Sequence, residues 1–176
     1  FHGHVFRGYW NSGRSLLVVY LERILARLAT AIITVSDSVR SDLLEFRIAP
    51  PERVHVLPLG MDLEAFVNCD AKRGEFRAEL GIVDGVPLVG IVGRLVPIKN
   101  HSLFLQAANQ LIRAGFEGRF VIVGGGELAA GLLATARDLG IANRVYFVGW
   151  RRDLDRIYAD LNVVVNAAIN EGTPVA

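Results

Sequence analysis

Residues 86–100 read VPLVGIVGRLVPIKN, a short apolar run that passes through a glycine into a polar loop. Similar runs follow at residues 120–127, which read FVIVGGGE, and at residues 144–150, which read RVYFVGW. Continuous Val/Ile/Leu runs of this length are typical of strands buried on both faces, as in parallel sheets. The predicted elements between and after them are helices at 102–114, 127–139 and 154–160 and a fourth strand at 162–165. The alternation predicts an α/β domain with a parallel sheet covered by helices.

The upstream part of the chain adds one more strand–helix–strand unit. A helical stripe at 14–30 leads into a β-branched run at 31–35, and Ser36-Asp37-Ser38 are good N-caps for a helix at 39–46. A strand at 54–57 completes the unit. We therefore expect parts of two Rossmann-like domains. Their predicted bounds are residues 1–57, a linker at 58–73, and residues 74–176 with a first helix at 72–80.

The composition is that of a globular chain and excludes several classes of protein. Hydrophobic residues make up 52% of the 176 residues, and 19 Lys and Arg balance 18 Asp and Glu, which excludes the strongly basic surface of a nucleic-acid binder. The single cysteine, Cys69, cannot form an internal disulfide, which fits a reducing compartment. Glu22, Arg23 and Arg27 interrupt the apolar stretch 16–31, so this stretch is not a membrane span.

The loop after the first strand of the second domain combines a glycine with two cations. Ligands of such sheets bind beyond the carboxyl ends of the strands. Gly93 allows a close approach of the backbone, and Arg94 and Lys99 suit the oxygens of a diphosphate, whose charge they would neutralise as a leaving group. The alternative is that both cations are solvated surface residues.

The glycines at 124–126 admit two interpretations. A strand that turns through Gly124 into a helix can bind an anion at the helix start, as in dinucleotide-binding folds. The third glycine of that fingerprint would fall on Ala129, and plain turn geometry is the competing interpretation. No acidic residue follows about 20 positions on to hold a ribose, since Asn143 and Arg144 occupy that region, so a nicotinamide dehydrogenase is a distant possibility.

Three further segments contain polar residues that could serve a site. Glu171, followed by Gly172 and Thr173, could hold hydroxyls and an anionic group, or could be a helix N-terminal acid. Asp153-Leu154-Asp155 resembles a metal-binding Asp-x-Asp, but it opens a predicted helix, where N-capping and first-turn roles are expected. His2-Gly3-His4 could donate to a developing charge, bind a metal or be exposed, and its spacing leaves these open.

Taken in order, these segments resemble the retaining glycosyltransferases of the GT-B architecture, in glycosyltransferase family 4, also called group 1. The resemblance covers nearly the whole chain. Its segments are His2–His4, Ile33–Ser36, Val56–Asp62, Val92–Leu95 with Lys99, Val123–Glu127, Val145–Trp150 and Asn170–Pro174. The opening also resembles bacterial members that build surface polysaccharides.

The resemblance implies a role for each matching position. Arg94 and Lys99 match the pair that binds the donor diphosphate, and Glu171 matches the first of two glutamates separated by seven residues. Residues 148–151 match the stretch along the nucleotide base, and His2 matches a histidine near the transferred sugar. The implied catalytic residues are Arg94, Lys99, Glu171 and His2. The implied donor-binding residues are Gly93, Arg94, Lys99, Gly124, Val148, Trp150, Arg151, Glu171, Gly172 and Thr173.

The implied activity is metal-independent transfer of a sugar from a UDP- or GDP-linked donor to an acceptor hydroxyl, with retention and without a cofactor. The acceptor would be a sugar, a lipid-linked molecule or a small molecule, with no nucleic acid involved. The protein would be cytoplasmic, either free or in peripheral contact with the inner face of the membrane. A nucleotide-sugar epimerase of the same fold and a non-catalytic sugar-nucleotide-binding module are the alternatives.

Two positions depart from the family pattern. The second glutamate would fall three residues beyond Ala176, and Asn100 stands where many members have glycine. The chain opens at Phe1 without a methionine and stops inside a motif. We therefore expect it to be a piece of a longer protein, to which the function belongs.

Overall fold

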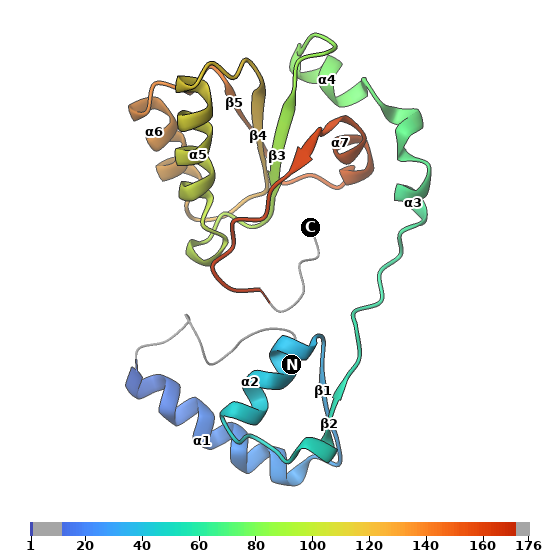
Figure 1. Cartoon of the computed structure of the whole chain (residues 1–176), viewed down its shortest axis with the longest axis vertical. Helices are drawn as coiled ribbons and strands as arrows, with labels where there is room; N and C mark the ends of the chain where they lie inside the picture. Colours follow the sequence, from blue (N-terminus) through green and yellow to red (C-terminus); the bar gives the residue numbers. More distant parts are fainter. Residues whose placement is uncertain (2–11, 172–176) are drawn as a thin grey trace. The chain divides into compact units, whose positions relative to one another are not determined.

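The computed structural model describes Phe1 and residues 12–171, apart from the side chains of residues 12–15. Contacts divide the chain into two compact units. The first consists of Phe1–Met61 and the segment that begins at Ile169, and the second consists of Asp62–Ala168. Each unit contains a parallel sheet with helices packed on it, so the predicted α/β, GT-B-like class is confirmed (Figure 1). Within the described residues, each helix is too short or too polar to cross a bilayer.

The first unit is a strand–helix–strand unit preceded by a longer helix. Its elements are α1 (Ser12–Leu28), β1 (Ile32–Thr34), α2 (Asp37–Glu45), a 3-10 turn (Pro51–Arg53) and β2 (Val54–Val56). β1 and β2 pair in parallel, with Ile33 opposite His55. The hydroxyl of Ser36 accepts a hydrogen bond from the Val39 amide at 3.3 Å, so α2 is capped by a residue that the sequence predicted as a cap.

The end of α2 is a Schellman-type turn with an arginine in the place usually taken by glycine. The amide of Ile48 donates to the Leu43 carbonyl at 2.8 Å, and Arg47 between them has a φ of 50°. This left-handed conformation is unstrained for glycine, but it costs a residue with a side chain about 1–2 kcal/mol. Arg47 therefore stands at this turn against its conformational preference.

The second unit is a four-stranded parallel sheet in the order β5-β4-β3-β6. Its strands are β3 (Leu88–Val92), β4 (Arg119–Val123), β5 (Val145–Gly149) and β6 (Val163–Val164). Its helices are α3 (Glu64–Val67), α4 (Glu75–Leu80), α5 (His101–Arg113), α6 (Ala129–Asp138) and α7 (Leu154–Asp160). Two 3-10 turns, Cys69–Lys72 and Pro97–Lys99, complete it.

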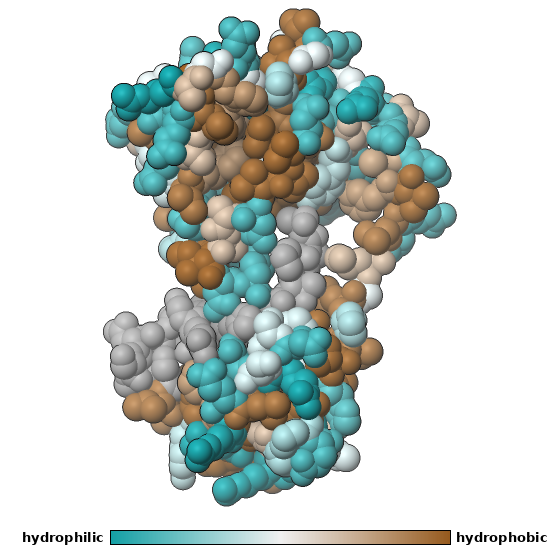
Figure 2. Space-filling view, viewed as in Figure 1, coloured by the Kyte–Doolittle hydropathy of each residue, from teal (hydrophilic) through white to brown (hydrophobic). Residues whose placement is uncertain are grey.

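Alternate residues of the central strands face opposite layers of helices. Ile91 and Ile122 pack in one buried cluster with side chains of α5 and α6, whereas Leu88 and Val121 pack in another with side chains of α4 and α7. Figure 1 shows these two helix pairs on either side of the sheet. Burial on both faces explains the continuous apolar runs in the sequence. At the β6 edge the sheet is uncovered, and apolar surface is visible there in Figure 2.

Most predicted elements differ from the observed ones by one or two residues at either end. Two differences are larger. Helix α3 was not expected inside the stretch 58–73, within which the division between the units also falls. The helix expected at 72–80 begins only at Glu75, because a 3-10 turn ends at Lys72 and Gly74 takes a φ of 94°.

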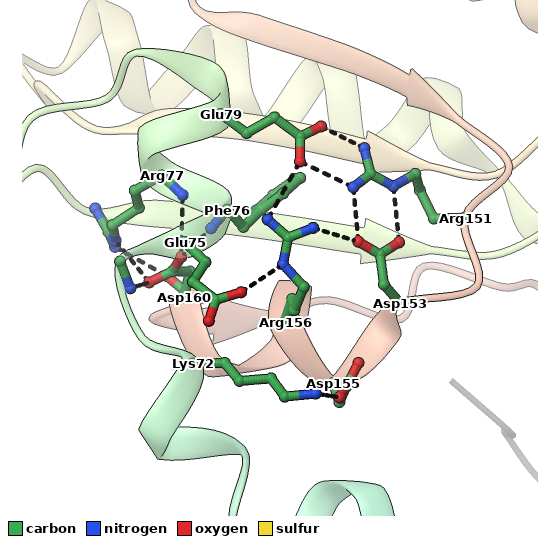
Figure 3. Close-up of polar contacts among 11 residues, drawn as sticks. Lys72, Glu75, Phe76, Arg77, Glu79, Arg151, Asp153, Asp155, Arg156 and Asp160 are labelled. Atoms are coloured by element: carbon green, nitrogen blue, oxygen red, sulfur yellow. Dashed lines mark hydrogen bonds and ion pairs between the residues drawn. The ribbon is translucent and has the colours of Figure 1, made fainter.

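Helix α4 is capped by a carboxylate from the other end of the unit. Asp160 is fully buried and accepts hydrogen bonds from the amides of Gly74 (2.6 Å), Phe76 (2.9 Å) and Arg77 (3.0 Å). The Arg77 guanidinium in turn donates to the Asp160 carbonyl at 2.9 Å and to Asn162 Oδ1 at 2.7 Å. Figure 3 shows Arg77 beside Asp160. This buried network fixes α4 against α7 and the start of β6.

Candidate functional site

The carboxyl ends of three neighbouring strands bring three loops together. β3, β4 and β5 lie side by side, and their following loops are joined by backbone hydrogen bonds. The Gly93 amide donates to the Val123 carbonyl at 2.9 Å, and the Leu95 amide donates to the Gly125 carbonyl at 2.9 Å. The Gly124 amide donates to the Gly149 carbonyl at 2.8 Å. The loops therefore form one rigid edge at the position where sheets of this kind bind ligands.

The close approach of these loops explains two of the three consecutive glycines. A Cβ at Gly124 would lie 1.9 Å from the Gly93 carbonyl oxygen, and one at Gly126 would lie 2.5 Å from the Leu95 carbonyl oxygen. Gly124 also has a φ of 144°, which side-chain-bearing residues rarely adopt. Gly125 has no such conflict, since its nearest neighbour would be Trp150 Cβ at 3.8 Å. Loop packing thus accounts for Gly124 and Gly126.

A cavity of about 190 Å³ opens between these loops. It is lined by Val92, Gly93, Arg94, Val123, Gly124, Gly125, Trp150, Arg151 and Leu154. Arg94 is exposed, and no hydrogen bond or ion pair joins its guanidinium to any residue that the structure describes. Its guanidinium therefore offers all of its donors to an incoming anion.

Lys99 and His101 follow Arg94 along the chain, at the end of the loop and the start of α5. The side chain of Lys99 passes Gly93, with its Cδ 3.8 Å from where a Gly93 Cβ would stand. His101 is 1% exposed, and burial, followed by the charge of Lys99, lowers the pKa of its imidazole. The imidazole is therefore neutral at pH 7, and the positive charge of this loop resides on Arg94 and Lys99.

Asn100 occupies the position at which many members of the family have glycine. Asn100 has a φ of 52° and directly precedes α5. Asparagine is among the side-chain-bearing residues that tolerate this left-handed region best. The substitution therefore preserves the turn that places Lys99 beside Gly93.

Arg151 lines the cavity, but its guanidinium is already engaged. It donates through Nε (2.9 Å) and Nη2 (2.7 Å) to the Asp153 carboxylate and through Nη1 (2.5 Å) and Nη2 (2.9 Å) to Glu79 on α4 (Figure 3). Hydrogen bonding to Asp153 and then to Glu79 raises the pKa of Arg151, and the same contacts lower the pKa of both carboxyl groups. Arg151 thus fixes the loop after β5 to α4.

Trp150 is the exposed aromatic surface of the cavity. It is 67% exposed, and the guanidinium carbon of Arg152 lies 5.1 Å from the centre of its ring. This is a cation–π contact, which holds the indole in place while leaving much of it open to solvent. A flat exposed ring beside a cationic loop suits a planar, negatively charged ligand.

The structure thus brings five of the predicted site residues to one cavity, namely Gly93, Arg94, Gly124, Trp150 and Arg151. Lys99 lies beside them, whereas Val148 packs against the buried cluster of α4 and α7. Glu171 belongs to the segment that is grouped with the first unit. His2, Gly172 and Thr173 lie outside the described residues. Their roles stay predictions.

Asp153 and Asp155 occupy the N-cap and first-turn positions of α7 that the sequence predicted, but the side chain of Asp153 makes no capping hydrogen bond. Its carboxylate instead binds Arg151 and Arg156, and Asp155 pairs with Lys72 (Figure 3). The neighbouring cations attract these carboxylates more strongly than the helix amides do. Among the described residues, no group of three or more His, Cys, Asp or Glu side chains could hold a metal ion.

Gly125, Arg152 and the ion pairs to Glu79 were not predicted from the sequence. Gly125 was within reach, because it stands in the glycine run and lacks a side chain that would fill the cavity. The pairs of Arg151 with Glu79 join residues 72 positions apart, and no sequence pattern indicated them.

The family models for two glycosyltransferase groups match the chain. "Glycosyl transferases group 1" matches residues 86–176, and "Glycosyltransferase Family 4" matches residues 1–65. The chain belongs to the glycosyl transferases group 1 family, which confirms the resemblance inferred from the sequence.

Two of the curated relatives of the chain are bacterial proteins named as glycosyltransferases. The chain is 30% identical over 179 residues to the UDP-Gal:alpha-D-GlcNAc-diphosphoundecaprenol alpha-1,3-galactosyltransferase of Escherichia coli, covering 99% of this chain and 46% of that protein. It is 34% identical over 134 residues to the D-inositol 3-phosphate glycosyltransferase of Nocardia farcinica, covering 72% of this chain and 29% of that protein. The chain thus spans about half the length of the first relative, and less of the second.

Solved structures of the same fold include Anabaena HepE in complex with UDP and glucose. That structure matches with a TM-score of 0.77 at 22% identity, covering 96% of this chain and 45% of that one. The sucrose-phosphate synthase of Thermosynechococcus elongatus matches with a TM-score of 0.78 at 20% identity, covering 97% of this chain and 43% of that one. At these identities the matches establish the fold.

Proposed function

We propose that the whole protein transfers a sugar from a nucleotide-sugar donor to an acceptor hydroxyl, with retained anomeric configuration and without a metal ion or other cofactor. The observation that supports this best is Arg94, an exposed and unpartnered guanidinium at a glycine-lined cavity beyond three parallel strands. Such a position suits the diphosphate of a nucleotide sugar. The family membership supplies the reaction class.

In this proposal the cationic loop acts on the leaving group. As the bond between sugar and diphosphate breaks, negative charge grows on the diphosphate oxygens, and Arg94 and Lys99 stabilise it. These two cations replace the charge that a divalent metal would supply. Trp150 offers its exposed ring to the base, and Arg151 fixes the loop that carries this ring rather than binding the donor itself.

The remaining parts of the mechanism rest on the family resemblance. Glu171 would hold the donor sugar, with amides of Gly172 and Thr173 beside it, and His2 would lie on the acceptor side. The similarity to a galactosyltransferase named for a diphosphoundecaprenol acceptor supports a role in bacterial surface polysaccharide synthesis. A lipid-linked acceptor would place the protein at the inner face of the membrane.

A product assay on the full-length protein tests the reaction. Incubation with UDP- and GDP-sugars should release nucleoside diphosphate only when an acceptor is present, and the product should keep the anomeric configuration of the donor. A free or altered sugar formed without an acceptor would indicate the epimerase. Binding of the nucleotide without turnover would indicate a non-catalytic module.

A matched pair of variants tests the role of Arg94. Arg94→Ala should lower kcat/KM at least a hundredfold, the order of magnitude of losing one transition-state contact to developing charge. Arg113→Ala removes an exposed arginine from the end of α5 and should leave turnover unchanged. Equal activity of the two variants would contradict the assignment.

A further inference from the structure

The first unit contains an arginine-lined cavity that the proposed function does not use. Its volume is about 430 Å³, and its lining includes Arg23, Arg27, Arg47 and Arg53. The other lining residues are apolar side chains and two prolines, and no acidic side chain of the described chain lines it. The cavity lies where α1 ends before β1 and where α2 ends before β2. It is therefore at the amino ends of these strands, whereas the donor loops follow carboxyl ends.

Two of the four arginines are held by helix-end carbonyls. Arg23 donates to the Phe46 carbonyl through Nε (3.1 Å) and Nη2 (2.8 Å), and Arg53 donates through Nη2 to the Ala26 carbonyl at 2.9 Å. Cations favour the carbonyl end of a helix, which explains their orientation. A carbonyl group is neutral, so both guanidinium groups keep their full charge and have donors left for another partner.

The side chains of the other two arginines are not held by helix-end carbonyls. Arg27 and Arg47 are exposed, and the guanidinium of neither forms an ion pair or hydrogen bond with any described residue. Arg47 also holds the strained φ of 50° at the turn where glycine would be unstrained. Strained residues of this kind concentrate at binding sites, where the side chain offsets the conformational cost. Folding stability alone would favour glycine at this position.

We propose that this cavity binds a phosphate-bearing anion. Guanidinium groups match phosphate oxygens with paired hydrogen bonds, and a cluster of them without carboxylates leaves positive charge that such an anion neutralises. The guanidinium groups of Arg23 and Arg53, held by carbonyl groups, line the site, and Arg27 and Arg47 supply donors that no described residue uses. A free diphosphate and a phospholipid headgroup share this chemistry.

Two titrations test the proposal and separate these sources. Both use the 176-residue chain with Arg94→Ala and Lys99→Ala, so that phosphate binding at the donor loop does not contribute. Inorganic pyrophosphate is titrated calorimetrically, and cosedimentation compares vesicles of phosphatidylglycerol with vesicles of phosphatidylcholine. We expect saturable binding of pyrophosphate, or of the phosphatidylglycerol vesicles over the neutral ones, that weakens with added salt. Binding of pyrophosphate alone assigns a soluble phosphate, and binding of the vesicles alone assigns the headgroup.

Variants connect the binding to the cavity. Arg27→Gln and Arg47→Gly should each weaken binding about tenfold, as expected for the loss of charge-assisted hydrogen bonds. Arg47→Gly also relieves the backbone strain, so a folding defect cannot account for its loss of binding, and thermal unfolding verifies this. Arg113→Gln on α5 is the matched control and should bind like the parent. Absence of binding in both titrations, or equal binding by all three variants, would overturn the proposal.

Discussion

Replacing Gly124 by alanine tests whether the loops of the donor cavity are held together as the structure describes. A Cβ at this position would lie 1.9 Å from the Gly93 carbonyl oxygen, whereas real Cβ contacts essentially never fall below 3.0 Å. The loops after β3 and β4 would therefore have to separate by the 1.1 Å that divides these two values. That movement stretches the hydrogen bonds from Gly93 to Val123 and from Leu95 to Gly125, each now 2.9 Å long.

The expected destabilisation follows from these losses. Each weakened hydrogen bond contributes about 1 kcal/mol. The φ of 144° adds strain of about 1–3 kcal/mol for a residue with a side chain. We therefore expect Gly124→Ala to lower the free energy of unfolding by about 3–5 kcal/mol, a large part of the usual 5–15 kcal/mol. Urea unfolding followed by circular dichroism measures this, and nucleotide binding should weaken in the same variant.

Two neighbouring glycines provide the controls. Gly125→Ala would meet only Trp150 Cβ at 3.8 Å, an ordinary contact, so its stability should change by less than about 1 kcal/mol. Gly131→Ala lies in α6 with nothing within 4 Å and should stabilise the protein by about 0.5–1 kcal/mol. The explanation would be refuted if the free energy of unfolding of Gly124→Ala lay within about 1 kcal/mol of that of the parent while Gly131→Ala was stabilised. The close approach of the loops would then not be the reason why position 124 requires glycine.

Three other predictions concern the frame around the site. Asp160→Ala should lower the free energy of unfolding in urea by about 3–5 kcal/mol, because it leaves the buried Arg77 charge and three amides without their partner. A loss of less than about 1 kcal/mol would argue against the network. Asn100→Gly should unfold at an equal or higher urea concentration than the parent, while Asn100→Ala should lose about 1 kcal/mol; a stable alanine variant would count against the left-handed turn. The hydrogen bond from Arg151 lowers the pKa of Asp153, so the ionised Asp153 carboxylate stabilises the fold above its unfolded pKa near 4, and this stabilisation is lost as the pH falls below that value. Arg151→Gln should therefore reduce the loss in free energy of unfolding between pH 6 and pH 2. An unchanged pH dependence of that free energy would refute this.

The sheet could be predicted from the sequence because burial on both faces leaves a direct signal. Runs such as 86–92 and 120–123 contain no polar residue, as is typical of parallel strands that helices cover on both faces. The positions of Arg94 and Gly124 at the edge of the sheet could be predicted for the same reason, since each follows such a run within two residues. The carboxyl ends of neighbouring parallel strands necessarily meet at one edge.

Contacts between segments that lie far apart in the chain could not be predicted from the sequence. Asp153 was expected to cap α7, but Arg151 and Arg156 bind its carboxylate, and only the folded chain brings Glu79 beside them. The start of α4 was misjudged because the carboxylate that caps it, Asp160, comes from the far end of the unit. Such pairs depend on tertiary placement, for which local propensity holds no information.

The central claim is that the edge beyond β3, β4 and β5 binds the diphosphate of a nucleotide sugar through Arg94. Calorimetric titration of UDP, GDP and ADP, and of their sugar conjugates, into the full-length protein without added divalent metal tests it directly. We predict that one nucleotide series binds and that Arg94→Ala weakens its binding at least about tenfold. Absence of binding to the folded protein, or equal affinity of Arg94→Ala, would contradict the claim.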